Sequence, residues 1–359
     1  MNIKSTLKQL SEMDGPSGRE HAIAGLISQL LEPLCDEVRT DAMSNVIGLK
    51  RGDGPDPRPR VMLMAHSDEI QMMVSAIDGP FLRFVQLSYD PRVLVGQEVM
   101  VFGRRKLRGV IGDRPPHLMW PRERRQMPDI TDLVIDTGLD AVAVAEYVQV
   151  GDYVLVERPF MELLGDRVAG KAFDNRLSVV TMLATLDQLQ RIQHLCDVIA
   201  VASVGEEFNG LGARTATFQV QPDIAIALDV TFGKQPGADD IGSFDLGCGP
   251  VIGIGPNLDG RVTDKLIDVG KNLEIPYEIE PLPASSGTDA WMIQVMVGGI
   301  PTGLVGIAIR NMHSPVEVAD LQDVSRSARL LSTFLGEADQ AFVDQLAYHL
   351  PDFEEEEAV

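Results

Sequence analysis

Four short apolar runs, each followed closely by a residue that can bind a metal ion, constrain this sequence more than any other feature. The runs cover residues 61–65, 198–204, 224–228 and 303–309. Runs of this length and composition are typical of strands buried on both faces, as in an α/β sheet covered by helices. Segments 175–192 and 320–335 have the pattern expected of the covering helices. The sequence therefore predicts an α/β core.

The residues that follow these runs share one kind of chemistry. They are His66 after the first run, Glu206 and Glu207 after the second, Asp229 after the third, and His313 a short gap after the fourth. In open α/β sheets, ligands bind outside the carboxyl ends of the strands. We therefore expect these side chains at one rim of the sheet, together with Asp174, which stands just before a predicted helix.

The set of side chains indicates the kind of ion. With one of the two adjacent glutamates left out, the set has two imidazoles and three carboxylates, which suit zinc, manganese or cobalt. A pair of divalent ions about 3.5–4 Å apart can activate a water molecule and polarise a carbonyl together. Two ions need more ligands than three side chains supply, and one carboxylate must bridge them. The sequence thus predicts a two-metal hydrolytic site.

Residue spacing separates supporting residues from direct ligands. Side chains at i and i+2 of an extended segment point the same way, so Asp68 can hydrogen-bond the imidazole of His66. Glu206 and Glu207 are neighbours and cannot point identically, so one can hold metal while the other carries protons. Each element alone also has a structural explanation, such as a helix N-cap for Asp174 or a core position for His313. Their joint placement at expected strand exits favours the metal site.

The middle of the chain has a different character. Segments 81–87, 98–110, 132–136 and 148–157 read as short strands broken by Gly, Pro and Asp. We expect a catalytic α/β domain formed by residues 1–74 and 166–345, a small β-rich domain inserted at 75–165, and an acidic tail at 346–359. Ser17 and Glu20 have the spacing of a capping box, which predicts the first helix behind Ser17.

Composition excludes several classes of function. The formal net charge of −22 disfavours nucleic acid as a partner. No apolar run approaches the ~20 residues that cross a bilayer, and the N-terminus has no apolar signal segment. Three cysteines stand far apart without metal-binding spacing. We expect a cytoplasmic protein that binds neither membrane nor nucleic acid.

Six short motifs resemble those of the family-42 metallo-aminopeptidases, which include glutamyl and tetrahedral aminopeptidases. The motifs are AHSDEI (65–70), KAFDNR (171–176), EE (206–207) ahead of GA (212–213), LDVT (228–231), GTDA (287–290) and MHSPVE (312–317). They run in the order of the family and cover most of the chain. The resemblance implies a three-layer α/β/α sandwich with a mixed sheet and an inserted β domain used in dimer contacts.

The resemblance also implies a role for each residue. Asp174 would bridge two divalent ions, with zinc expected and cobalt or manganese as alternatives. His66 and Asp229 would complete one metal site, and Glu207 and His313 the other. Glu206 would be the general base and acid, and Asp68 the partner of His66. The chain departs from usual family residues at Gln71, Gly205 and Asn311.

The predicted function is hydrolysis of the N-terminal peptide bond of peptides by a metallo-aminopeptidase that self-associates into dimers, or into dodecamers as in the family. One alternative is a glycoside hydrolase of endoglucanase type, since paired acids also cleave sugars. Aromatic residues make up only 5% of the chain, which disfavours the stacking platforms of sugar sites. Another alternative is a catalytically silent metal-binding assembly protein. The preferred N-terminal residue cannot be predicted from the sequence.

Overall fold

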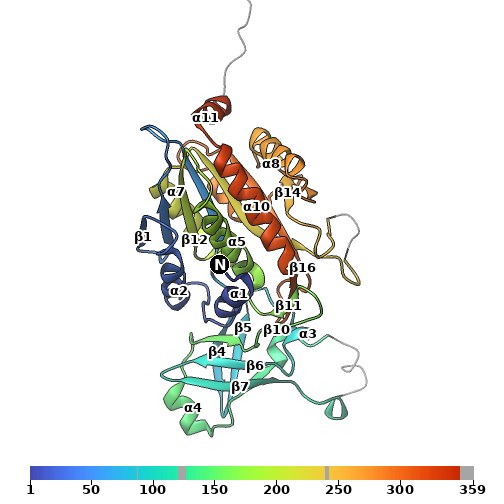
Figure 1. Ribbon diagram of the computed structural model, residues 1–359. Helices are drawn as coiled ribbons and strands as arrows, with labels where there is room; N and C mark the ends of the chain where they lie inside the picture. Colours follow the sequence, from blue (N-terminus) through green and yellow to red (C-terminus); the bar gives the residue numbers. More distant parts are fainter. Residues whose placement is uncertain (87, 120–126, 239–241, 348–359) are drawn as a thin grey trace, which may run out of the picture.

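The computed structural model describes residues 1–359 except 87, 120–126, 239–241 and 348–359. At its centre is an eight-stranded mixed sheet with the strand order β1-β2-β12-β3-β13-β16-β14-β15 (Figure 1). In that order the strands are β1 (Glu37–Thr40), β2 (Val46–Lys50), β12 (Asp197–Ser203), β3 (Arg60–His66), β13 (Ile224–Phe232), β16 (Thr302–Ile309), β14 (Val251–Ile254) and β15 (Glu278–Pro281). The four middle strands β12, β3, β13 and β16 are parallel, and antiparallel pairing begins at β2 and β14.

Helices cover both faces of the sheet because its strands are apolar on both sides. Along β3, Val61, Leu63 and Ala65 join one core cluster, whereas Met62 and Met64 join another. The first cluster includes residues of α1 (Ile3–Ser11), α2 (His21–Leu31), α5 (Phe173–Leu189), α8 (Gly260–Asn272) and α10 (Leu321–Glu337). The second includes residues of α7 (Leu211–Val220) and α9 (Asp289–Ile293). Alternate side chains therefore point to opposite layers, as strand geometry requires.

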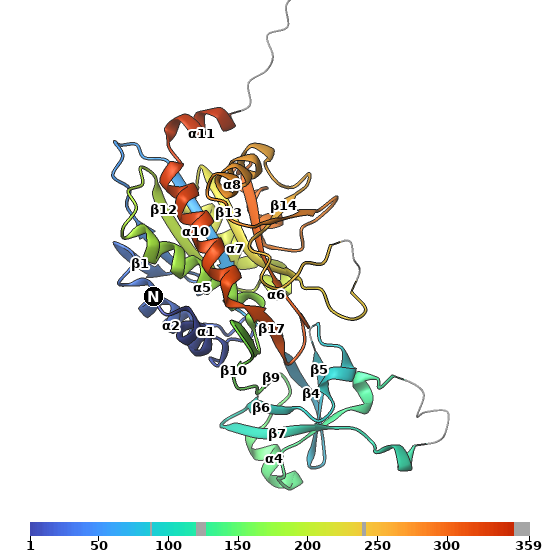
Figure 2. The ribbon, with the colours of Figure 1, turned by 45° about the vertical axis from the view of Figure 1, so that its right-hand side comes forward.

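A closed β-barrel lies below the sheet and has its own core (Figure 2). Its strands, in barrel order, are β4 (Met72–Asp78), β5 (Phe81–Gln86), β8 (Val134–Asp136), β7 (Lys106–Gly112), β6 (Glu98–Phe102) and β9 (Tyr153–Val156). The short helices α3 (Pro91–Leu94) and α4 (Ala141–Tyr147) accompany the barrel, and α11 (Gln340–Leu346) follows α10. A small sheet of β10 (Met161–Glu162), β11 (Arg167–Gly170) and β17 (Glu317–Asp320) stands near the barrel.

The predicted fold class is confirmed. The four apolar runs form β3, β12, β13 and β16, and the two predicted covering helices are α5 and α10. The predicted capping box is wrong, because α2 begins at His21 and is preceded by α1, which the sequence reading missed. The Ser17 hydroxyl donates instead to Asp68, and Glu20 accepts from the backbone N–H of Gly18.

The division of the chain into domains stays a prediction, although all six barrel strands fall between Met72 and Val156. Of the predicted acidic tail, only residues 346 and 347 are described, and the rest lies outside the described residues. Within the described part of the chain, the helices are all too short or too polar to cross a membrane.

Candidate metal centre

The carboxyl edge of the parallel strands brings the candidate residues together. Strand β3 ends at His66, and β12 is followed by α6 (Glu206–Asn209), which begins with the two adjacent glutamates. The sequence placed Asp229 at a strand end, but it lies inside β13, which continues to Phe232. The reason is that β13 stops pairing with β3 at Ala227 yet remains paired with β16 up to Phe232. Asp229 therefore lies level with His66, just past the paired part of β3 and β13, and its Oδ1 is 3.8 Å from His66 Nε2.

Five side chains form two groups that could each hold a metal ion. The first group is His66, Asp174 and Asp229, and the second is Asp174, Glu207 and His313. Within each group the ligand atoms lie within 4.8 Å of one another. These are the five residues that the sequence selected as ligands, and their division between two sites is the one implied by the family resemblance.

Asp174 belongs to both groups because its two oxygens face different imidazoles. Its Oδ1 lies 3.2 Å from His66 Nε2, and its Oδ2 lies 3.3 Å from His313 Nε2. His313 Nε2 is also 3.4 Å from Glu207 Oε2. A carboxylate placed in this way can connect two ions, which is the geometry a two-metal centre needs.

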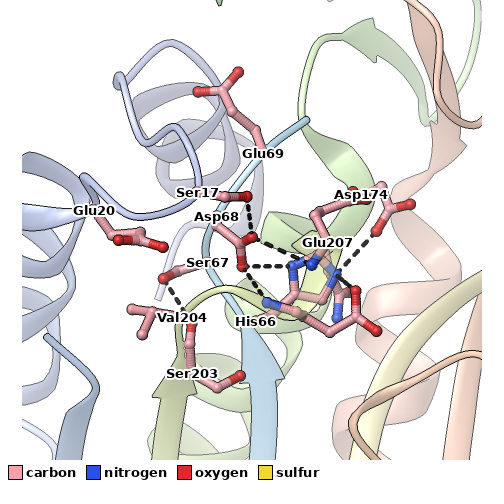
Figure 3. A network of polar contacts seen from close by, with 12 residues as sticks. Ser17, Glu20, His66, Ser67, Asp68, Glu69, Asp174, Ser203, Val204 and Glu207 are labelled. Carbon is pink, nitrogen blue, oxygen red and sulfur yellow. Dashed lines mark hydrogen bonds and ion pairs between the residues drawn. The ribbon is translucent and has the colours of Figure 1, made fainter. Parts of the chain in front are cut away.

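Asp68 lies beside His66 and Glu207 and contacts three segments of the chain (Figure 3). Its Oδ1 lies 3.3 Å from His66 Nδ1 and accepts the backbone N–H of Glu206 at 3.1 Å. Its Oδ2 accepts the Ser17 hydroxyl at 2.6 Å and the backbone N–H of Glu207 at 3.3 Å. The contact with Nδ1 leaves Nε2 of the imidazole directed at Asp174, which suits a metal-binding nitrogen.

Glu206 belongs to neither group but lies close to His66. Its Oε2 lies 3.7 Å from His66 Nε2, and its side chain lines the cavity above the five candidate ligands. Burial raises the pKa of Glu206 to about 8, and the Asp289 and Asp174 carboxylates add to this effect. A carboxylate near reacting groups with a pKa close to neutral suits a proton carrier.

The buried carboxylates of the centre need added positive charge to be ionised together. Burial and the carboxylate of Asp174 raise the pKa of Glu207, and burial raises that of Asp229. Burial also acts to raise the pKa of Asp174, but its contacts with His313 and His66 outweigh this and lower it. Several carboxylates crowded into a buried space can all be ionised only when nearby cations balance their negative charge. The donor set and its crowding therefore fit divalent ions.

Glu317, the last residue of the MHSPVE motif and not among the predicted site residues, fixes two of the candidate ligands through the backbone. Its Oε2 accepts the N–H groups of Phe173 at 2.7 Å and Asp174 at 3.1 Å, and its Oε1 accepts that of His313 at 3.1 Å. His313 has φ of +57°, a left-handed conformation that is costly for a non-glycine residue. The only sequence signal was its position four residues after His313.

A buried ionic network lies next to the centre. Glu69 accepts hydrogen bonds from Lys171 Nζ at 2.5 Å, from Arg176 at 2.8 Å and from the backbone of Gly15 at 3.1 Å. Arg176 also donates to backbone carbonyls, including that of Ser67 at 3.2 Å. Glu69 and Arg176 each lie two positions or fewer from a site residue in the chain. The network therefore ties the segment after β3 to the start of α5.

A cavity of about 380 Å³ opens above the two groups. It is lined by all five candidate ligands and Glu206, and also by Ser88 from the segment that follows β5. Of the departures from family residues, Gln71 and Gly205 line a separate cavity of about 530 Å³, and Asn311 lines one of about 460 Å³ beside the centre. None of the three belongs to either ligand group.

Comparison with known proteins finds a family model and relatives that match most of this chain. The family model described as M42 glutamyl aminopeptidase matches residues 44–330. The lysyl aminopeptidase of Pyrococcus furiosus is 36% identical over 342 residues, which cover 92% of this chain and 96% of the relative.

Solved structures give the same result for the whole fold. An aminopeptidase from the archaeon Desulfurococcus kamchatkensis matches with a TM-score of 0.89 and 32% identity, covering 97% of this chain and 98% of that one. The TET1 peptidase of Pyrococcus horikoshii, described as able to assemble into a tetrahedron or a large octahedral shell, matches with a TM-score of 0.81 and 28% identity, covering 94% and 100%.

Proposed function

The chain belongs to the M42 glutamyl aminopeptidase family, and we propose that it removes N-terminal residues from peptides with two divalent metal ions. The family resemblance expected from the sequence is confirmed, and with it the assignment of the chain to the peptidases. The ligands in our proposal are His66 and Asp229 for one ion, Glu207 and His313 for the other, and Asp174 for both.

The observation that carries the proposal is the position of the Asp174 carboxylate between two imidazoles. Its oxygens lie 3.2 Å from His66 Nε2 and 3.3 Å from His313 Nε2. A structural ion pair would need only one such contact. A shared carboxylate within two mixed nitrogen and oxygen groups suits zinc, with cobalt or manganese as alternatives.

Two cations held by these ligands would supply Lewis acidity, lowering the pKa of a water molecule so that it can lose a proton and attack, and polarising the substrate carbonyl. Glu206 then accepts a proton from the attacking water and passes it to the nitrogen of the leaving amine. Positive charge at the centre would lower the pKa of Glu206 and so favour the ionised form that a proton acceptor needs. Asp68 orients His66 and the backbone of Glu206 during this transfer.

The proposal extends to partners and location. The substrates are peptides with a free N-terminus, and the protein acts in the cytoplasm without binding nucleic acid or membranes. It self-associates into dimers or larger shells, a suggestion supported by the assemblies described for the Pyrococcus horikoshii relative.

Hydrolysis of aminoacyl p-nitroanilides by metal-loaded enzyme tests the function. We expect chelation to abolish turnover and zinc, cobalt or manganese to restore it. Glu206→Gln should retain bound metal, measured by elemental analysis, while kcat falls by about 10²–10⁴-fold. Glu278→Gln is the matched control, because Glu278 is exposed on β15 and lines none of the cavities described above.

Three outcomes would contradict the proposal. Wild-type turnover by Glu206→Gln would exclude its role as proton carrier. Cleavage of nitrophenyl glycosides that survives chelation would favour the glycoside hydrolase. Metal binding without hydrolysis of any aminoacyl substrate would favour the catalytically silent assembly protein.

A further inference from the structure

Besides Glu206, the cavity above the metal centre contains one carboxylate that neither metal group uses. Glu280 lines this cavity and also the adjoining one of about 460 Å³, so it stands where the two meet. It lies on the edge strand β15, in register with Gly253 of β14. The inference drawn from this residue rests on the proposed function, because it concerns the substrate class of the same site.

Glu280 reaches back across the sheet toward the metal centre. Its Oε1 accepts the hydroxyl of Thr231, which lies on β13 two residues after Asp229, at 2.8 Å. Strands β14 and β16 lie between β15 and β13 in the sheet. Gly306 of β16 pairs with Asp229 and lines the cavity, and a Cβ at this position would lie only 3.3 Å from Cγ2 of Thr231.

Glu280 lacks a cationic partner. Among the described residues, no lysine, arginine or histidine forms an ion pair with it, and its one hydrogen-bond partner is Thr231. Burial raises the pKa of Glu280, and the Thr231 hydroxyl only partly offsets this effect. A half-buried carboxylate is costly unless a cation or several donors satisfy it.

The cavity walls favour a cation over an anion. The described lining residues of both cavities include no lysine or arginine, so an acidic substrate side chain would meet carboxylates and no fixed cation beyond the metal centre. Phe232, Leu304 and Met312 add apolar surface, and Phe232 is 59% exposed. Long basic side chains bury their methylene stems on such surfaces while the charged end reaches a polar group. An aromatic face also attracts a cation.

We propose that the enzyme prefers peptides whose first residue is lysine or arginine, and that Glu280 binds the ammonium or guanidinium group of that residue. The scissile bond lies at the metal centre, and the side chain of the first residue extends along the cavity toward β15. The net charge of −22 adds a field that attracts cationic substrates. Glu280 is thus a specificity-determining residue, separate from the metal ligands and from Glu206.

The first experiment measures kcat/KM for lysyl, arginyl, leucyl and glutamyl p-nitroanilides. For the wild-type enzyme we expect lysyl and arginyl substrates to exceed leucyl and glutamyl ones by at least ~10-fold, since a charge-assisted contact forms only with the former. In Glu280→Gln the ratio of lysyl to leucyl kcat/KM should fall by about 10-fold, mainly through a higher KM. Glu278→Gln, two residues away on the same strand and exposed, should keep the wild-type ratio.

A binding measurement removes turnover from the comparison. Calorimetry on metal-loaded Glu206→Gln compares free lysine with norleucine, which has a similar chain without the ammonium group. We expect lysine to bind at least ~5-fold more tightly, and the further change Glu280→Gln to abolish that difference.

The outcomes distinguish this inference from the function on which it rests. Faster hydrolysis of leucyl or glutamyl substrates would overturn the basic preference and leave the aminopeptidase intact. An unchanged lysyl-to-leucyl ratio in Glu280→Gln would overturn the role of Glu280. Absence of hydrolysis for every substrate would overturn both the proposed function and this inference.

Discussion

Replacing Glu317 with glutamine tests whether the backbone around the metal centre is held by one buried carboxylate. Glu317 is only 2% exposed and receives three backbone N–H groups, two on Oε2 and one on Oε1. The amide of glutamine keeps a single oxygen. Directed at Phe173 and Asp174, that oxygen leaves the N–H of His313 facing an NH₂ group, so one hydrogen bond is lost and the other two go to a neutral acceptor.

The expected loss of metal affinity follows from the loss of this hydrogen bond. A hydrogen bond to a charged group contributes about 1.5–3 kcal/mol, and each 1.4 kcal/mol is tenfold in affinity. If the lost hydrogen-bond energy destabilises only the backbone arrangement that binds metal, the affinity for metal drops by about 10–100-fold. This is the range measured for residues that orient metal ligands. Competition with a chromogenic chelator measures this affinity directly, with Glu278→Gln as the control. A metal affinity within twofold of wild type would refute the argument that Glu317 positions Asp174 and His313.

Two further changes test the surroundings of the centre. Glu69→Gln leaves the buried cations Lys171 and Arg176 without their carboxylate, so we expect the free energy of unfolding in urea to fall by about 3–5 kcal/mol, and an unchanged midpoint would contradict this. Burial raises the pKa of Glu20 to about 7. Because the folded state then binds the extra proton, Glu20 destabilises the fold increasingly as pH rises from about 4.5 to 7. Glu20→Gln should therefore stabilise the protein by about 1–3 kcal/mol at pH 8 and much less at pH 5, as measured by urea unfolding at both values.

The sequence predicted the central sheet and the candidate ligands because both depend on strong local patterns. Strands buried on both faces are nearly uniformly apolar, so β3, β12, β13 and β16 could be recognised individually. The parallel arrangement of these strands then places their carboxyl ends at one edge. His66 and Glu207 could therefore be predicted to meet before any distance was known.

Side chains that bind partners far away in the chain could not be assigned from the sequence. Ser17 has the spacing of a helix cap, but its hydroxyl is bound to Asp68, 51 positions away. Glu317 contacts the backbone of Phe173, 144 positions away, and no local pattern reports such a pairing. Glu280 is one of two acids on the edge strand β15, and its link to the centre runs through the hydroxyl of Thr231 on β13. Long-range packing decided each of these cases.

The five candidate ligands come from segments that are far apart in the chain, and this affects how the protein acquires its ions. His66 and His313 can meet only after β3, β13 and β16 have paired, so the complete centre does not exist in the unfolded chain. An ion held there binds the folded state alone and stabilises it by mass action, by about 2.7 kcal/mol at a free concentration 100 times the dissociation constant. Metal supply would thus regulate the lifetime of the protein as well as its turnover, and metal-starved molecules would be the first to reach the cell's degradation machinery.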